Sequence, residues 1–251
     1  MDERAALSPR DRLIVALDVP AVDEARRLVE RLDDAAGFYK IGMQLMFAGG
    51  LDYARELVAA GKRVFLDAKL FDIDETIERS VANVAAMGVD FLTVHGNGRT
   101  IPAAVRGRGD SRLRIMAVTV LTSLDEQDMA AIYGEGAKVS DFVRSRAQMA
   151  LEAGADGVIA SGNEAGMIRA LAADRIGVAD QSRDFSVVTP GIRLPGGEAG
   201  DQKRVATPAA AIAAGADYLV VGRPVYQAAD PRDAARRIVD DIAGALDAPA
   251  R

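Results

Sequence analysis

Short apolar runs rich in β-branched residues alternate with helix-forming stretches along the whole chain. Eight of these runs have the length and composition of buried strands, and they lie at 13–19, 38–43, 63–70, 91–96, 114–121, 156–161, 186–192 and 217–225. The stretches between them, such as 22–32 and 51–61, place apolar residues three and four positions apart, as amphipathic helices do. The phrase Ala-Gly-Ala-Asp at 153–156 and again at 214–217 marks the end of a helix and the turn into the next strand.

This alternation predicts an α/β protein that forms a single (β/α)8 TIM barrel, an architecture that takes about 250 residues. A doubly wound open sheet is the rival, although no GxGxxG motif follows the first run. Because no Pro/Ser-rich linker or change in composition divides the chain, we expect one domain over 1–251. In such a barrel the active site lies at the C-terminal ends of the strands.

Composition excludes several classes of function. The chain is 49% hydrophobic, carries a net charge of −6 and has no basic patch, so nucleic acid is an unexpected partner. It has no cysteine and one histidine, which excludes disulfides, thiolate nucleophiles and multi-histidine metal sites. The N-terminal segment has no apolar signal core, and no apolar run is long enough to span a membrane. We therefore expect a soluble, cytoplasmic protein with no membrane partner.

Polar residues recur where the predicted strands end. In chain order they are Asp18, Lys40, Asp67, Lys69, Asp72, His95, Thr122, Ser161, Arg193, Gly222 and Arg223. One charge at a strand end is ordinary, and a structural ion pair would explain it. Charges from so many strands at one end of a barrel favour a functional cleft instead.

The densest part of this set is VFLDAKLFDID at 64–74. Side chains alternate faces along a strand, so Asp67 and Lys69 should point the same way, with Asp72 in the turn that follows. Two carboxylates and an ammonium beside an apolar strand are costly to desolvate unless they pair.

The last two strands carry a second signal. The segment 187–204 contains four glycines and two prolines, so we expect a long, flexible connection there, and Arg193 and Gln202 lie within it. The eighth run then ends in Gly222-Arg223, where backbone N–H groups and a guanidinium could face an anion. The loops after strands seven and eight are the usual phosphate site of this architecture.

These segments resemble the orotidine 5′-monophosphate decarboxylase family, and the resemblance covers 12–245. It rests on LDV at 17–19, YKIG at 39–42, LDAKLFDI at 66–73, VTVLTS at 118–123, TPGIRLPGGEAGDQKR at 189–204 and VVGRP at 220–224. The last two long motifs are typical of the bacterial members. Many relatives have leucine, histidine and proline where this chain has Ala68, Phe71 and Asp74, and the smaller Ala68 could loosen packing around Lys69.

The resemblance implies cofactor-independent decarboxylation of orotidine 5′-monophosphate to uridine 5′-monophosphate and CO2, the last step of de novo UMP biosynthesis, by a homodimer. The catalytic residues would be Lys69, Asp67, Asp72 and Lys40, with Asp72 and Thr76 entering the neighbouring subunit's site. Asp18 would bind the ribose, Thr122 the pyrimidine, and Arg193, Gln202, Gly222 and Arg223 the phosphate region. No metal and no cofactor is implied.

The reaction itself explains why such residues are needed. Loss of CO2 leaves a carbanion on C6 of the ring, and neither an adjacent carbonyl nor a cofactor signature in the sequence provides an electron sink. A lysine can stabilise that charge and also donate a proton, which arginine holds too tightly. Opposite charges on nearby aspartates keep the lysine ionised.

Two rival functions and one open residue remain. A magnesium-dependent phosphosugar decarboxylase or aldolase shares the Asp67/Lys69/Asp72 spacing, but Lys40 would repel a metal there. A non-catalytic protein that binds a phosphate ligand is the other rival. His95 could act as a base, although a hydrogen-bonded structural histidine at a strand end is the commoner case.

Overall fold

The computed structural model describes residues 7–176, 185–194 and 204–248. Within these ranges eight parallel strands close into a barrel in sequence order, and β8 pairs with β1. The strands are β1 Leu13–Ala16, β2 Phe38–Gly42, β3 Arg63–Leu70, β4 Phe91–His95, β5 Arg114–Val118, β6 Gly157–Ile159, β7 Ser186–Thr189 and β8 Tyr218–Val221. The TIM barrel prediction is therefore confirmed, and the open sheet is excluded.

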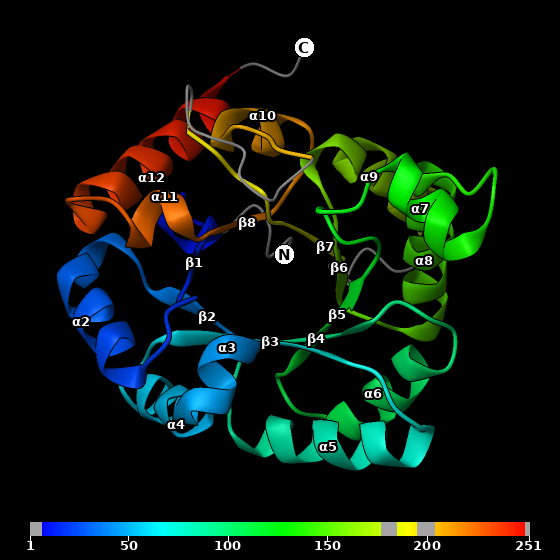
Figure 1. The fold of residues 1–251 in the computed structure, drawn as a ribbon, viewed down its shortest axis with the longest axis horizontal. Coiled ribbons are helices and arrows are strands. Elements are labelled where there is room, and N and C mark those ends of the chain that lie inside the picture. Colours follow the sequence, from blue (N-terminus) through cyan, green and yellow to red (C-terminus); the bar gives the residue numbers. More distant parts are fainter. Residues whose placement is uncertain (1–6, 177–184, 195–203, 249–251) are drawn as a thin grey trace.

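Helices surround the barrel on the outside (Figure 1). The long ones are α2 Val22–Leu32, α4 Leu51–Ala59, α5 Asp74–Ala86, α6 Thr100–Arg108, α7 Glu126–Tyr133, α8 Val139–Ala153, α9 Gly162–Ile176 and α12 Pro231–Asp247. Shorter helical segments are η1 Arg10–Arg12, η2 Asp33–Ala35, α3 Met43–Leu45, η3 Met46–Gly50, α10 Pro208–Ala213 and α11 Arg223–Tyr226. The helix predicted over 22–32 is confirmed as α2, and the one predicted over 51–61 ends as α4 at Ala59. In the described part of the chain, no helix has the length and apolar character needed to cross a bilayer.

Aromatic side chains fill the interior of the barrel. The rings of Phe38 and Phe91 lie 5.0 Å apart, and Phe91 and Tyr218 lie 5.1 Å apart, both edge to face. The guanidinium of Arg63, at the N-terminal end of β3, stands 4.1 Å from the centre of the Phe38 ring. These groups fill the end of the barrel where the strands begin, and a pocket opens at the opposite, C-terminal end.

An aspartate precedes each of β4, β6 and β8 and bonds to the strand before it. The carboxylates of Asp90, Asp156 and Asp217 accept the backbone N–H groups of Val64, Ile115 and Val187 at 2.9, 2.8 and 2.7 Å. The backbone N–H of each aspartate is donated to the carbonyl of that same residue. A glycine stands two residues before each of these aspartates, at Gly88, Gly154 and Gly215. This Gly-x-Asp motif therefore fixes the starts of β4, β6 and β8 to the preceding strands.

Candidate active site

A pocket of about 620 Å³ opens at the C-terminal ends of the strands. Its walls include eight of the residues predicted from the sequence: Asp18, Lys40, Asp67, Lys69, Thr122, Arg193, Gly222 and Arg223. They come from distant parts of the chain, and the barrel brings them to one opening because parallel strands end on the same side. The predicted cleft is therefore present.

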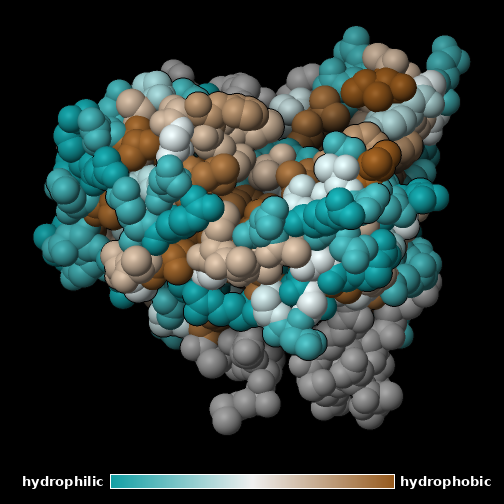
Figure 2. All heavy atoms as spheres, turned by 90° about the horizontal axis from the view of Figure 1, so that it is seen from below, coloured by the Kyte–Doolittle hydropathy of each residue, from teal (hydrophilic) through white to brown (hydrophobic). Residues whose placement is uncertain are grey.

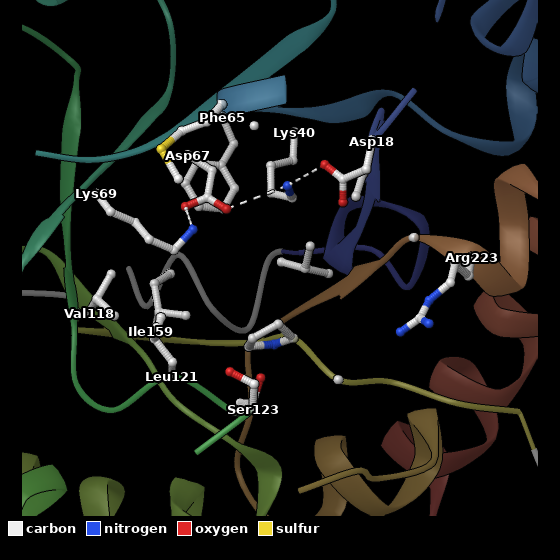
Figure 3. A pocket seen from close by; sticks show the side chains of 18 of the residues that line it. Asp18, Lys40, Phe65, Asp67, Lys69, Val118, Leu121, Ser123, Ile159 and Arg223 are labelled. Carbon is white, nitrogen blue, oxygen red and sulfur yellow. Dashed lines mark hydrogen bonds and ion pairs between the residues drawn. The ribbon is translucent and has the colours of Figure 1, made fainter. Parts of the chain in front are cut away.

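Four charged groups form a continuous chain along one wall of this pocket (Figure 3). Lys40 Nζ lies 2.9 Å from Asp18 Oδ1 and 3.4 Å from Asp67 Oδ2. Lys69 Nζ lies 2.7 Å from Asp67 Oδ1. The Lys40 side chain is 9% exposed, whereas that of Lys69 is 32% exposed. Lys69 is therefore the more accessible ammonium in the pocket, and Lys40 lies between the carboxylates of Asp18 and Asp67.

The charges of this chain stabilise one another. Burial by itself would raise the pKa of the Asp67 carboxyl, but Lys40, Lys69 and the hydrogen bonds it accepts outweigh burial and hold this pKa below its ordinary value. Burial would likewise lower the pKa of Lys40, and the attraction of Asp67 and Asp18 raises it instead. Asp67 and Lys40 therefore both stay ionised over a wide range of pH around neutrality.

Lys69 reaches the pocket through an irregularity in β3. Its backbone has φ +49°, which side chains other than glycine rarely adopt. The pairing of β3 with β4 shifts at the same place, since Leu66 pairs with Leu92 but Leu70 pairs with Val94. Asp67 and Lys69 point the same way, as predicted, since both line the pocket and their side chains pair. The regular alternation from which this was argued is wrong, because the strand has a bulge between Leu66 and Leu70.

The strand predicted over 217–225 is too long. β8 ends at Val221, and Arg223 begins the short helix α11. Pro224 explains the change, because proline cannot donate to a strand ladder and is favoured in the first turn of a helix. The turn at Gly222 directs the Arg223 guanidinium into the pocket on the side opposite Lys69 (Figure 3).

A largely buried arginine, Arg204, joins the segments that follow β5, β6 and β7. Arg204 Nη1 lies 2.6 Å from Glu164 Oε1 in α9, and both side chains are 11% exposed. Its Nη2 donates to the carbonyl oxygens of Val120 and Leu121 at 3.1 and 3.0 Å. These bonds hold the loop that carries Thr122 against the end of the connection that contains Arg193.

Comparison with known proteins identifies the family. The sequence profile of the orotidine 5′-phosphate decarboxylase / HUMPS family matches residues 11–238. The chain belongs to this family. The orotidine 5′-phosphate decarboxylase of Rhodopseudomonas palustris strain BisA53 is 55% identical over 236 residues, which is 94% of this chain and 96% of the relative.

Other members of the orotidine 5′-phosphate decarboxylase / HUMPS family agree in sequence and in fold. The orotidine 5′-phosphate decarboxylase of Methylobacterium sp. strain 4-46 is 53% identical, over 95% of this chain and 98% of the relative. The crystal structure of orotidine 5′-phosphate decarboxylase from Lactobacillus acidophilus superposes with a TM-score of 0.76 at 33% identity, over 92% of this chain and 98% of that one.

Two of the residues expected from the family resemblance, Asp72 and Thr76, are not brought into the pocket of their own chain. Asp72 lies in the turn between β3 and α5, where its carboxylate accepts the N–H of Ile73 at 2.7 Å. Thr76 lies in the first turn of α5, and both side chains are exposed to solvent outside the pocket. Gln202 falls outside the described residues.

Two of the polar strand-end residues also lie outside the pocket wall. Ser161 is buried, and its hydroxyl accepts the N–H of Asn163 at 3.3 Å at the start of α9. His95 is half-buried, and its ring lies 5.0 Å from that of Phe71. Its Nδ1 atom is buried and has no hydrogen-bond partner among the described residues.

Sequence reasoning missed Thr93, which is fully buried in the middle of β4. Its hydroxyl accepts the backbone N–H of Lys69 and donates to Asp67 Oδ1, both at 2.9 Å. A threonine inside an apolar strand is read as a strand former, so nothing in the local pattern indicates this contact. Ser123 and Tyr226, which also line the pocket, were likewise not singled out.

Proposed function

We propose that this chain catalyses the cofactor-independent decarboxylation of orotidine 5′-monophosphate to uridine 5′-monophosphate and CO2, as the last step of de novo UMP synthesis. The observation that carries this proposal is the alternation of ammonium and carboxylate groups from Lys40 through Asp67 to Lys69 along the pocket wall. Membership of the family and the names of the relatives support the decarboxylase activity.

Lys69 would stabilise the carbanion. When the bond from C6 to the carboxylate breaks, its electron pair remains on C6 and CO2 leaves. An ammonium about 3 Å away, at an effective dielectric near 20, lowers the energy of that charge by about 5 kcal/mol, or about four decades in rate. Lys69 would then donate one proton to C6 and regain one from solvent.

The surroundings of Lys69 suit this chemistry. Val118, Leu121 and Ile159 line the pocket in the region of the Lys69 ammonium (Figure 3). With a nucleotide in the pocket, these apolar side chains would exclude water and so strengthen the attraction between the ammonium and the carbanion. CO2 is itself apolar, so the same surface accommodates the leaving group.

Binding of the remote parts of the nucleotide would supply further catalysis. Arg223 and Arg193 would bind the phosphate, with Gly222 in the turn beside it, Thr122 would bind the pyrimidine and Asp18 the ribose. Gln202, in the connection that also carries Arg193, would join the phosphate site. A rate enhancement of about four decades from the ammonium is too small for so unreactive a substrate. Binding energy gained at the phosphate can supply more, because it can be used to close the pocket around the ring.

Asp72 and Thr76 would complete the site of a second copy of the chain. Figure 2 shows apolar side chains exposed on the side of the molecule that carries α4 and α5. Near the starts of these two helices, Phe47 in η3 is 89% exposed, and Phe71 and Ile73, just before α5, are 71% and 70% exposed. Exposed apolar groups in this number indicate a covered surface. A homodimer through this face would bury them and carry Asp72 and Thr76 toward the partner's pocket.

Turnover of orotidine 5′-monophosphate in the presence of EDTA, followed by loss of absorbance, tests this function. We expect metal-independent activity in the wild type and loss of turnover in Lys69→Ala, because the carbanion then lacks its cation. Calorimetry should still detect binding of uridine 5′-monophosphate to that variant, since Arg223 and Thr122 remain.

The outcomes separate the rivals. Activity that EDTA abolishes would favour the phosphosugar enzyme, in which a metal ion competes with Lys40 for Asp18 and Asp67. Nucleotide binding without turnover in the wild type would favour a binding protein. Near-normal turnover in Lys69→Ala would end the proposed mechanism.

A further inference from the structure

Thr93 occupies the one place where β4 faces the bulge of β3. The five residues of β3 from Leu66 to Leu70 lie against only three residues of β4, from Leu92 to Val94, and Thr93 is the middle one of these three. Its side chain is 0% exposed, so every polar atom it carries must find a partner within the protein.

The hydroxyl of Thr93 contacts both members of the Asp67–Lys69 pair. A hydroxyl has one hydrogen to donate, and here Oγ1 donates it to Asp67 Oδ1 at 2.9 Å. One of its lone pairs accepts the backbone N–H of Lys69 at 2.9 Å. The same carboxylate oxygen, Asp67 Oδ1, receives the Lys69 ammonium at 2.7 Å. The Thr93 side chain therefore holds Lys69 at two points. It binds the lysine backbone directly, and it binds the carboxylate oxygen that receives the lysine ammonium.

Lys69 needs such an anchor because its backbone is strained. A residue other than glycine at φ +49° is unfavourable and persists only where its surroundings hold it. The interruption of the ladder removes the strand partner that would otherwise accept the Lys69 N–H, and Thr93 supplies the acceptor instead. Without it the lysine backbone could relax toward ordinary strand geometry, which would move the ammonium.

We propose that Thr93 is a positioning residue, whose hydroxyl sets the place of the Lys69 ammonium and the orientation of the Asp67 carboxylate. This inference rests on the proposed function, in which that ammonium faces the reacting carbon. Thr93 itself is fully buried and is not one of the residues that line the pocket. Packing requires only a β-branched side chain at this point, so valine would fill the space and leave both hydrogen bonds unmade.

The test compares Thr93→Val, which removes the hydroxyl and keeps the shape, with Thr93→Ser, which keeps the hydroxyl. We expect kcat of the valine variant to fall about 10- to 100-fold, and that of the serine variant to stay within about threefold of wild type. The dissociation constant for uridine 5′-monophosphate should change less than about threefold in both, because the groups that bind the nucleotide are unaltered.

Thr119→Val is the matched control. Thr119 is also fully buried, and its hydroxyl donates to the carbonyl of Ile159 at 2.8 Å without contacting Asp67 or Lys69. This variant should lose stability comparable to that lost by Thr93→Val and retain kcat. Equal loss of kcat in both threonine-to-valine variants would reduce Thr93 to a structural role and overturn the proposal.

A readout independent of turnover separates this proposal from the proposed function. The Thr93 hydrogen bond helps to lower the pKa of Asp67, so the carboxyl resonance of Asp67, assigned with Asp67→Asn, should titrate at higher pH in Thr93→Val than in wild type or Thr93→Ser. An unchanged titration in the valine variant would contradict the inference even if the wild type proved inactive on orotidine 5′-monophosphate. If the valine variant does not fold, Thr93→Ala against Thr93→Ser isolates the hydroxyl in the same way.

Discussion

At the scale of single residues, His95 shows that a polar residue at a strand end need not belong to the site. It ends β4 at the level of the pocket, yet its ring lies outside the pocket wall and against Phe71. Burial lowers the pKa of His95, and the positive charge of nearby Arg146 lowers it further. A neutral, partly buried ring at this place indicates a structural role.

The effect of pH on stability follows from that shift. Because the folded-state pKa of His95 lies below the unfolded value of about 6.5, its contribution to stability is complete above that pH and is lost as pH falls through the folded-state pKa. We expect His95→Gln to flatten the fall in free energy of unfolding between pH 7.5 and 5.5, measured by urea denaturation. As the only histidine in the chain, it accounts for this window almost alone.

The same variant also tests for a catalytic role. We expect its kcat at pH 7 to stay within about threefold of wild type, because the ring has no contact with the pocket. A kcat that instead fell by orders of magnitude, with an altered pH profile, would return His95 to the list of candidate bases.

At the scale of secondary-structure elements, much of the barrel could be predicted from local patterns. Helix α2 and strand β3 begin and end where the sequence places them, because their apolar spacing is unambiguous over their whole length. The end of β8 was misplaced because Val225 is buried in helix α11 as it would be in a strand, and hydrophobicity alone does not distinguish the two. Pro224 was the available signal.

What the sequence could not predict depends on contacts between elements. The bulge at Lys69 is held by Thr93 from the next strand, and no sequence pattern within 63–70 predicts the bulge. The tie between Arg204 and Glu164 likewise joins segments 40 positions apart. The charged residues at the strand ends were predictable because a barrel sends all C-terminal ends to one side, whereas their supports are specified by tertiary packing.

The aspartates that precede the even strands give a prediction at this scale. The Asp217 side chain is 1% exposed and pairs with Arg169. Asp90 pairs more loosely with Arg63, with Oδ1 and Nε 3.5 Å apart, and these side chains are 20% and 31% exposed. Asp217→Ala should lower the free energy of unfolding by about 3–5 kcal/mol, because it removes the buried carboxylate that pairs with Arg169 and accepts the backbone N–H of Val187. Asp90→Ala should cost about 1–2 kcal/mol, since water can replace part of what is lost. Equal losses in urea denaturation would contradict this account of the motif.

At the scale of the whole molecule, one copy of the chain leaves its proposed site incomplete. The pocket holds Lys69, Asp67 and Lys40, while Asp72 and Thr76 stand outside it on the same exposed side as Phe71 and Ile73. A two-fold dimer would place the same surface of each copy against the other, so each copy would both give and receive these residues.

Mixing two inactive variants tests this arrangement. Lys69→Ala and Asp72→Ala should each be strongly impaired as homodimers, because every site then lacks one catalytic group. In a heterodimer of the two, one site contains both lesions, and the other combines Lys69 of one subunit with Asp72 of its partner and is intact. Random exchange makes about half of the dimers mixed, so about a quarter of wild-type activity should return after co-refolding. If Asp72 acted within its own subunit, every site in the mixture would still carry one lesion and no activity would return.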